Sequence, residues 1–230
     1  MASGIQKLYT QIPETYELVN HLLTFGLDIF WRKKLIKKVK NNHGLNWLDV
    51  CTGTGETAVY LTRISKNGNQ VFATDFSFPM VRVAKKKNES NSIKFSISEI
   101  KRLPFLKDTF DLITLSFATR NINTNRQELI SGLSEINRVL KTGGIFFNLE
   151  TSQPTNPVVR TLFHWYAKIF IKPIGSGISG SKAAYSYLAS SMTKFYNADE
   201  LKTILHEAGF QLVEYERILF GAAAIHSAIK

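Results

Sequence analysis

Short apolar segments rich in β-branched residues alternate with longer amphipathic segments along the chain from Asn46 onward. This alternation is typical of βαβ units, in which helices connect the strands of a parallel sheet. The pattern predicts strands at residues 46–51, 70–75, 93–97, 110–116 and 145–150. It predicts helices between them at residues 56–65, 78–87 and 126–140, and the Gly143-Gly144 pair is expected to end the last of these.

The final part of the chain predicts a helix at residues 198–208, followed by strands at 210–217 and 222–229 that meet near Gly221. Two strands joined so closely must be antiparallel, because a parallel return needs about a dozen or more connecting residues. The expected fold class is therefore α/β, with a mostly parallel seven-stranded sheet that ends in an antiparallel hairpin. This arrangement is typical of the Rossmann-like class I methyltransferase fold, whereas the ordinary dinucleotide-binding fold lacks the final hairpin.

Two segments lie outside the regular alternation. Residues 1–44 form a predicted N-terminal helical cap, with helices at 14–24 and 29–40. Residues 151–196 contain three of the six prolines, an aromatic helix-like stretch at 160–171 and a glycine- and serine-rich loop at 175–181. We interpret this segment as an insertion that forms a lid over the carboxyl edge of the sheet. Residues 1–230 are thus expected to form a single domain.

Composition supports one globular domain and leaves its partner open. The 230 residues are 44% hydrophobic, which suffices for one buried core. Lys and Arg number 29 against 18 Asp and Glu, and the net charge of +11 fits a nucleic acid, an anionic membrane or an anionic substrate. Much of the excess lies in basic runs that form either solvated helix faces or a contact with anionic lipid, at residues 32–34, 37, 38, 40 and 85–87.

A cytoplasmic protein is expected. Cys51 is the single cysteine, so no internal disulfide can form, which fits a reducing compartment. The N-terminus has neither a secretory apolar core nor an Arg-rich transit pattern. No run of about 18 uncharged apolar residues occurs, so we expect no membrane span and at most a peripheral contact with the inner face of the cytoplasmic membrane.

The loop after the first strand carries the clearest binding motif. Gly53 and Gly55 lie between this strand and the next helix, where glycines let the backbone turn sharply and approach a ligand. Asp75 ends the second strand, where an acid can accept hydrogen bonds from both hydroxyls of a ribose. The spacing Gly53-x-Gly55-x-x-Ala58 fits a dinucleotide, and the same loop fits S-adenosylmethionine.

Asp49 favours S-adenosylmethionine, because an acid at this position would crowd a pyrophosphate and suits a ligand that carries an ammonium group and a sulfonium. The alternative for Asp49 is a carboxylate that braces the loop. Glu99 and Ile100 follow the third strand, where a carboxylate and a backbone N–H can bind adenine, and the alternative for Glu99 is a solvated loop acid. Phe76 and Met80 are expected to pack either on the adenine or in the core.

Four separated segments carry a resemblance to a known family. They are residues 16–20 running on to Trp31, residues 116–121, residues 138–144 continuing to 150–152, and residues 185–188 with Ser191 and Phe195. Together with the glycine loop, these segments resemble the ubiquinone/menaquinone biosynthesis C-methyltransferase family and follow that family's order.

The resemblance implies that S-adenosylmethionine is the cofactor and that its methyl group goes to a ring carbon of a polyprenylated quinol. Demethylmenaquinol is favoured over the methoxy-benzoquinol precursor of ubiquinone. Carried over by position, the family's cofactor contacts are Thr54, Asp75, Glu99, Ile100 and Ser116. The chain departs from the family pattern at Asp28, where the family usually has His, and at Thr52, Glu99 and Thr142.

Methylation of an aromatic carbon requires electron density at that carbon, which ionisation of the adjacent hydroxyl supplies. Arg120 and Asn121 are our first choice for orienting the quinol and stabilising its oxygen. His164, Tyr187 and Glu150 are candidates to contact the substrate or the water that accepts its proton, and each has a purely structural alternative. The aromatic residues of the lid are expected to form either a path for the prenyl chain or an ordinary core.

Rival functions stay open at this point. A methyltransferase of the same fold could act on RNA or on another small molecule, but the chain has no Pro-Pro motif of the kind that methylation of exocyclic base amines usually involves, so no nucleic acid is expected. A non-catalytic membrane-surface or RNA-binding module would not need Asp49, Asp75 and Glu99 together. No metal is expected, and the sequence leaves a homodimer open.

Overall fold

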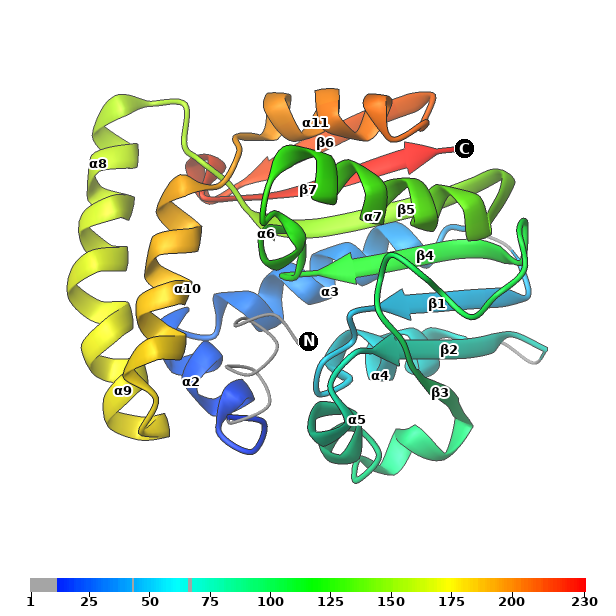
Figure 1. Ribbon diagram of the computed structural model, residues 1–230, viewed down its shortest axis with the longest axis horizontal. Helices are drawn as coiled ribbons and strands as arrows, with labels where there is room; N and C mark the ends of the chain where they lie inside the picture. The colour runs from blue at the N-terminus through cyan, green and yellow to red at the C-terminus, as the bar shows by residue number, and fades with distance from the viewer. Residues whose placement is uncertain (1–11, 43, 66–67) are drawn as a thin grey trace.

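The computed structural model describes residues 12–42, 44–65 and 68–230. Its centre is a seven-stranded sheet in the order β3-β2-β1-β4-β5-β7-β6 (Figure 1). Neighbouring strands from β3 to β5 are parallel, and β7 pairs antiparallel with both β5 and β6, which confirms the predicted fold class. The strands are β1 Asn46–Val50, β2 Gln70–Asp75, β3 Ile93–Ile97, β4 Phe110–Ser116, β5 Leu140–Thr151, β6 Leu212–Ile218 and β7 Ala223–Ile229.

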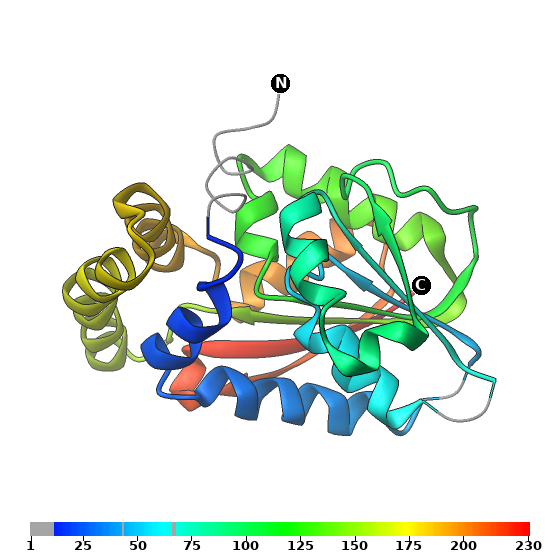
Figure 2. The ribbon, with the colours of Figure 1, turned by 90° about the horizontal axis from the view of Figure 1, so that it is seen from below.

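Helices cover both faces of this sheet (Figure 2). On one face, α7 and α11 bury Leu129, Leu133 and Leu201 in one core cluster, and on the other face α3 and α4 bury Leu35 and Leu61 in a second cluster. Burial of such apolar stripes is the main stabilising contribution. The helices that surround the sheet are α2 Tyr16–Leu23, α3 Leu27–Val39, α4 Glu56–Ile64, α5 Phe78–Ala84, α6 Thr119–Ile122, α7 Arg126–Val139 and α11 Ala198–Glu207, with short 3₁₀ turns η1 Asn88–Ser92 and η3 Leu219–Gly221.

Strand order places the loops that carry polar side chains at one edge. The chain runs from β1 outward to β3 and then returns to β4 on the other side of β1. Asp49 is therefore flanked by Ala73 of β2 and Thr114 of β4 in the parallel register. Ligands of open α/β sheets bind at such a reversal, outside the carboxyl ends of the strands.

The predicted end of α7 is wrong. The helix ends at Val139, and Leu140 is already extended and pairs with Phe110 as the first residue of β5. Gly143 and Gly144 lie inside the strand, where the register shifts between Phe110 and Leu112, and a Cβ on Gly144 would come within 2.9 Å of the Leu140 side chain. The two glycines thus allow an irregular strand start instead of a helix cap.

The lid segment is helical for most of its length. It consists of α8 Pro157–Tyr166, the π-helical turn η2 Ala167–Ile171, α9 Lys172–Ser179 and α10 Lys182–Lys194. The predicted loop at residues 175–181 is therefore wrong, because only the turn at Gly180 and Ser181 separates α9 from α10. Gly175 permits the helix to form here, since Tyr185 of α10 packs where a side chain on Gly175 would stand.

A third core cluster joins the lid to the N-terminal helix α2. Its buried residues come from α2, η2 and α10 and from the segment before α2, and they are Ile12, Val19, Leu23, Ala167, Ile171, Ala184, Tyr185 and Leu188. In Figures 1 and 2 the lid helices accordingly form a separate group beside the sheet, next to α2. The lid therefore packs on the N-terminal helices as well as on its own residues.

The packing of α9 on α10 can be tested with two glycines of the same helix. A Cβ on Gly175 would lie 2.1 Å from the Tyr185 ring, whereas a Cβ on Gly177 would meet nothing within 4 Å. We expect Gly175→Ala to lower the free energy of unfolding by about 1–3 kcal/mol, because the Tyr185 ring must leave its site. Gly177→Ala should leave it unchanged or raise it by about 0.5–1 kcal/mol. Thermal unfolding of both variants measures this, and equal melting temperatures would contradict the packing.

Candidate functional site

A cavity of about 320 Å³, named cavity 1, lies at the carboxyl edge of β1 to β4. Among its lining residues are seven that were predicted from the sequence: Gly53, Thr54, Asp75, Glu99, Ile100, Ser116 and Asn121. Phe76 and Met80 also line it, and the Met80 side chain is buried. Residues from four separate loops are thus brought together at the place that the strand order specifies.

The two glycines of the loop have different roles. Gly53 has φ +55°, lines cavity 1, and a Cβ there would meet no atom within 4 Å, so its backbone leaves room for a ligand. Gly55 has φ +82° and is not among the lining residues; a Cβ there would come within 2.9 Å of the Ala84 Cβ. Gly55 therefore lets α4 and α5 approach each other closely, and its predicted contact with a cofactor stays a prediction.

Asp75 presents a buried carboxylate to cavity 1. Its two oxygens accept hydrogen bonds from the backbone N–H groups of Gly53 and Ser77, each at 2.8 Å. Burial nevertheless raises the pKa of Asp75 to about 6. Each carboxylate oxygen keeps a further lone pair, so the group can still accept two hydrogen bonds from a vicinal diol in the cavity.

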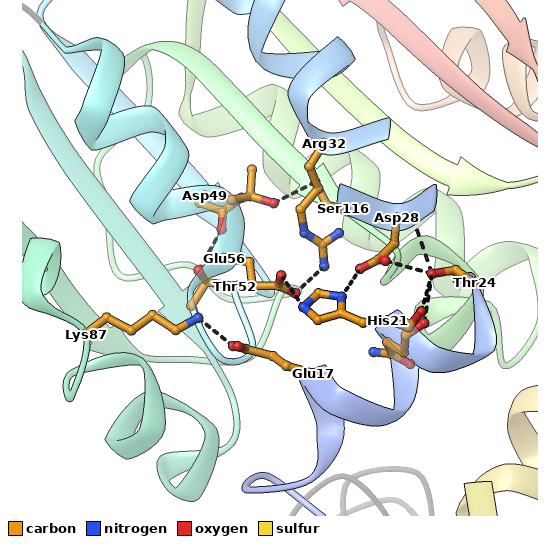
Figure 3. Close-up of polar contacts among 12 residues, drawn as sticks. Glu17, His21, Thr24, Asp28, Arg32, Asp49, Thr52, Glu56, Lys87 and Ser116 are labelled. Carbon is orange, nitrogen blue, oxygen red and sulfur yellow. Dashed lines mark hydrogen bonds and ion pairs between the residues drawn. The ribbon is translucent and has the colours of Figure 1, made fainter. Parts of the chain in front are cut away.

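Asp49 lies beneath the loop and is only 1% exposed. Its two oxygens accept hydrogen bonds from the hydroxyls of Thr52 and Thr114, both at 2.6 Å (Figure 3 shows the bond to Thr52). Burial raises the pKa of Asp49 to about 6. Asp49 is not among the residues that line cavity 1, so the structure gives it the loop-bracing role, and its predicted contact with an ammonium group stays a prediction.

A second cavity of about 350 Å³, named cavity 2, lies between the N-terminal helices and the lid. Its lining is mostly apolar and comes from α2, α3, α8, α10 and the turn between β6 and β7, with Leu23, Leu27, Trp31, Val159, Leu162, Phe163, Tyr166, Leu188 and Met192 among its residues. Tyr16, Arg32 and Phe117 line both cavities. A polar and an apolar cavity therefore share one wall.

Arg32 is the central charge of this shared wall, and its side chain is buried. Its Nη2 donates to Glu56 at 2.9 Å, and His21 contacts both Glu56, at 3.5 Å, and Asp28, at 2.8 Å (Figure 3). The guanidinium lies 4.8 Å from the centre of the Phe117 ring. Its Nε and Nη1 have no hydrogen-bond partner within the described part of the chain. The prediction that groups Arg32 with the basic surface runs is therefore wrong.

Neighbouring carboxylates of this network are matched by cations. Glu17, His21 and Glu56 place ligand atoms within 4.8 Å of one another, as a metal site would require. However, Lys87 binds Glu17 at 2.5 Å and Arg32 binds Glu56. These cations already balance the carboxylates, so the charges of the cluster do not call for a metal ion.

Arg120 and Asn121 are placed at the two cavities. Arg120 lines cavity 2, is 5% exposed and forms an ion pair with Glu150, while Asn121 lines cavity 1. Glu150 is itself buried and also accepts hydrogen bonds from Thr151. Adjacent residues of α6 therefore serve both cavities, and Glu150 is held in place by Arg120 and Thr151.

The two predicted substrate residues of the lid are not among the residues that line either cavity. His164 shares a hydrogen bond of 2.7 Å with Gln153, and partial burial lowers its pKa. Burial raises the pKa of Tyr187, and the positive charge of Arg120 opposes that shift. Tyr187 thus lies within electrostatic reach of the Arg120–Glu150 pair, and the substrate contacts of both residues stay predictions.

Strained backbone surrounds cavity 2. Six non-glycine residues of the described ranges have positive φ values, and four of them, Phe25, Phe117, Leu219 and Phe220, line this cavity. A fifth, Cys51, lines cavity 1. Left-handed backbone at a non-glycine residue costs about 1–3 kcal/mol and concentrates at functional sites. The strain is an observation, separate from the shape of the cavity, that favours a functional role for cavity 2.

The burial of Asp49 predicts a specific dependence of stability on pH. Because its pKa is raised in the folded protein, the ionised form destabilises the fold, a cost that is absent below about pH 4 and complete above about pH 6. Asp49→Asn should remove this cost, so the variant should gain up to about 3 kcal/mol relative to the natural chain as the pH rises from about 4 to about 8. Melting temperatures across this range measure the gain.

Asp111→Asn is the matched control for this experiment. Partial burial raises the pKa of Asp111, but hydrogen bonds from Lys141 and from the backbone of Asn46 and Leu45 lower it, and the pKa is lowered on balance. The Asp111→Asn variant should therefore lose stability relative to the natural chain as the pH rises, which is the opposite sign. A pH-independent difference for Asp49→Asn would mean that Asp49 is not buried as described.

Comparisons with known proteins agree with this geometry. The model of the ubiE/COQ5 methyltransferase family matches residues 2–230. The chain is 32% identical over 231 residues to the demethylmenaquinone methyltransferase of Lactiplantibacillus plantarum, a match that covers 99% of this chain and 96% of that protein. It is 33% identical over 235 residues to the ubiquinone/menaquinone biosynthesis C-methyltransferase UbiE of Rickettsia bellii, covering 99% and 93%.

Solved structures show the same fold at low sequence identity. A SAM-dependent methyltransferase of Thermotoga maritima, described as a possible histamine N-methyltransferase, superposes with a TM-score of 0.70 at 14% identity and covers 98% of this chain and 99% of its own. These likenesses confirm the class I methyltransferase fold, and the family match confirms the resemblance found in the sequence. The chain belongs to the ubiE/COQ5 methyltransferase family and is a methyltransferase that depends on S-adenosylmethionine.

Proposed function

We propose that the chain methylates a ring carbon of a polyprenylated quinol, that demethylmenaquinol is the favoured substrate, and that cavity 1 holds S-adenosylmethionine. The observation that carries the proposal is the shared wall of two cavities with different chemistry. A polar cofactor needs the first cavity, and an apolar prenyl tail needs the second. The head group of the substrate is then placed at the wall formed by Tyr16, Arg32 and Phe117. Relatives named demethylmenaquinone methyltransferase support this choice.

The residues of cavity 1 fit S-adenosylmethionine. Asp75 accepts hydrogen bonds from the ribose hydroxyls, and the open space at Gly53 admits the ligand beside the loop. The Glu99 carboxylate could accept a hydrogen bond from the adenine amino group and the backbone N–H of Ile100 could donate one to the ring, and Met80 lines the same cavity. When bound, S-adenosylmethionine supplies an electrophilic methyl group on a positively charged sulfur.

Two buried guanidinium groups favour ionisation of the quinol. Arg32 lines both cavities, and Arg120 lines cavity 2. The positive charges of Arg120 and Arg32 both lower the pKa of Tyr16, although burial raises it on balance, which places both cations close to the shared wall. A phenolate oxygen at that wall is stabilised strongly because the surroundings are dry. Asn121 orients the ring from the side of cavity 1.

The phenolic proton needs an acceptor beside the same wall. Glu56 lines cavity 1, and its oxygens contact Arg32 and His21. His21 continues the contact to Asp28, whose other oxygen accepts a hydrogen bond from Thr24 at 2.7 Å. We assign Glu56 as the acceptor and His21 as the residue that relays the proton away from the cavity. His21 and Asp28 thereby both gain a role in proton transfer. Asp28 is the position at which the family usually has His.

The proposed substrate is dissolved in a membrane. Within residues 12–42, 44–65 and 68–230, no helix has both the length and the apolar character needed to cross a bilayer. We propose that the protein works from the cytoplasmic side as a peripheral membrane protein, with its substrate reaching cavity 2 from the lipid.

The substrate can be identified by label transfer. The purified protein is supplied with methyl-labelled S-adenosylmethionine and, under reducing conditions, with demethylmenaquinol, with the methoxy-benzoquinol precursor of ubiquinone, or with RNA. We expect label in the quinol products alone and at least about tenfold faster transfer to demethylmenaquinol. Transfer to RNA, or to neither quinol, would contradict the proposal.

The division of labour between the cavities is tested by three substitutions. Arg120→Met and Arg32→Met should each slow turnover by at least about 100-fold, because a cation beside the phenolate is lost, while S-adenosylmethionine still binds. Asp75→Ala should instead weaken S-adenosylmethionine binding by at least about 100-fold, because two hydrogen bonds to a carboxylate are lost. Isothermal calorimetry and single-turnover rates separate the two effects.

Each arginine supports a buried carboxylate, so a loss of folding must be distinguished from a loss of chemistry. Arg120→Met is therefore compared with Arg120→Met/Glu150→Gln, in which both charges of the buried pair are removed. Arg32→Met is compared with Arg32→Met/Glu56→Gln in folding alone, because the double variant also lacks the proposed proton acceptor Glu56. Circular dichroism and melting temperature report the fold. Normal turnover in a folded Arg120 or Arg32 variant would remove that residue from the mechanism.

A further inference from the structure

The outer side of the lid exposes a continuous row of large apolar side chains. Along α8 and η2, Val158, Leu162, Trp165 and Ile169 follow one another at intervals of three or four residues, and their exposed fractions are 68%, 63%, 65% and 48%. Phe170, Ile174 and Ile178 continue the row onto α9, at 46%, 37% and 39%. We call these seven residues the outer lid face. Exposed apolar surface of this extent marks an interaction site.

The same helices are apolar on their inner side as well. Val159, Phe163 and Tyr166 line cavity 2, and Ala167 and Ile171 are buried in the cluster with α2. The outer and inner apolar side chains of α8 are neighbours on one wide stripe, and Arg160, Thr161, His164 and Lys168 occupy the remaining side. The inner part of this stripe is covered by the protein, whereas its outer part stays exposed in the described part of the chain, where an apolar environment outside the protein would cover it.

The charge of the lid identifies that outer environment. Residues 151–198 contain no Asp or Glu, but they contain five Lys or Arg. Arg160, Lys168, Lys182 and Lys194 are all exposed. Exposed apolar side chains next to cations alone are complementary to a bilayer with anionic head groups.

The mouth of cavity 2 lies beside this surface. Phe25 and Phe220 line the cavity and are 82% and 81% exposed, so the cavity reaches the surface between the turn after α2 and the turn between β6 and β7. The Phe25 ring lies 6.4 Å from that of Tyr166 in α8. In Figures 1 and 2, α8 and α9 form the outer boundary of the molecule on this side.

We propose that the outer lid face inserts into the interfacial region of an anionic lipid bilayer and thereby brings the mouth of cavity 2 to the membrane. This inference rests on the proposed quinol substrate and adds the surface by which the protein reaches it. A prenyl chain then passes from the lipid between Phe25 and Phe220 into cavity 2 without crossing water. Lys168 and Lys182 lie at the level of the head groups, where their charges bind anionic lipid.

The basic runs predicted from the sequence are less suited to this role. Lys34 and Lys38 both bind Glu216, at 2.5 and 2.8 Å, and Lys86 binds Glu14 at 3.1 Å. Lys87 is engaged by Glu17. Three carboxylates therefore offset part of the charge of these runs, with Lys34 and Lys38 sharing one of them, whereas residues 151–198 contain no acid.

The protein carries a natural probe for the test. Of its three tryptophans, Trp31 and Trp47 are 6% and 3% exposed, and Trp165 on the outer lid face is 65% exposed. The experiment mixes the full chain with vesicles of phosphatidylcholine alone or with phosphatidylglycerol and records co-sedimentation and tryptophan emission. We expect binding that requires phosphatidylglycerol and falls with salt, emission that shifts to shorter wavelength, and quenching by brominated lipid. Absence of binding, or binding without a change in Trp165, would overturn the proposal.

Matched variants locate the surface. Val158→Glu/Ile169→Glu changes two residues of the outer lid face that do not line cavity 2, and it should weaken vesicle binding by at least about tenfold. Leu106→Glu/Leu212→Glu places the same charges at leucines that are 83% and 66% exposed elsewhere, and it should bind as the natural chain does. Equal loss in both variants, or in neither, would overturn the assignment.

Two further measurements separate this proposal from its alternatives. If the natural chain forms a dimer in analytical ultracentrifugation without lipid and Val158→Glu/Ile169→Glu makes it monomeric, the face is an interface between copies and the lipid proposal is overturned. Methyl transfer to a short-chain, water-soluble quinol tests the proposed function without a membrane. It should be equal in the natural chain and in Val158→Glu/Ile169→Glu, while transfer to a long-chain quinol in vesicles should fall at least about tenfold in the variant only.

Discussion

The buried contact between Arg32 and Glu56 is the constraint on which the site depends. It joins α3, which belongs to the N-terminal helices, to the first residue of α4, which follows the glycine loop. Desolvation of two such charges is costly, and removing either partner alone would cost about 3–5 kcal/mol. His21 and Asp28 extend the contact to α2. The network therefore fixes the N-terminal helices over the carboxyl edge of the sheet, where they complete cavity 1 and supply one side of cavity 2.

A buried ion pair is seldom the most stabilising pair of residues at an interior site, because well-packed apolar residues of the same size often stabilise a protein as much or more. The proposed roles of Arg32 and Glu56 toward the quinol would account for the presence of this pair. Two nitrogens of Arg32, Nε and Nη1, have no hydrogen-bond partner in the described part of the chain, and Phe117, whose backbone is strained, packs on its guanidinium. The unpartnered nitrogens and the strained backbone destabilise the shared wall, and the same arrangement holds a cation in a fixed position away from water.

The sheet was predictable because its strands have strong local signals. Buried parallel strands read as short β-rich runs, and the close spacing of the last two runs required an antiparallel hairpin. Asp75 and Glu99 were predicted for the same reason, since the carboxyl ends of parallel strands meet at one edge, whereas Ser116 was predicted from the family resemblance. The place of a residue in the fold can therefore be predicted from the sequence wherever the hydrophobic pattern clearly indicates a strand or a helix.

The errors arose where a distant contact outweighs the local signal. Gly143 and Gly144 would end a helix in isolation, but pairing of Leu140 with Phe110 begins the strand earlier. The glycines of α9 favour a loop, but α9 is helical and packs against Tyr185 at Gly175. The error for Arg32 had a different cause. The spacing that predicts burial of this residue was present in the sequence, but the adjacent lysines indicated an exposed basic run. In α3 the buried positions 28, 31, 32, 35, 36 and 39 recur at helical spacing, so Asp28 and Arg32 fall on the apolar stripe.

The N-terminal helices contact the lid through apolar side chains and contact the site through charged ones, so the lid can move separately from the site. Its inner residues share a core cluster with α2, which is separate from the two clusters that hold the sheet. Polar contacts of His21 and Glu17 tie α2 itself to α4 and to Lys87 after α5. A movement of α8 away from Phe25 would widen cavity 2 at the expense of apolar contacts and of the hydrogen bond between His164 and Gln153, while the charged wall beside cavity 1 stayed in place. If the outer lid face inserts into a bilayer as we propose, lipid would replace those lost contacts, and the membrane would lower the cost of opening on the side from which the proposed substrate comes.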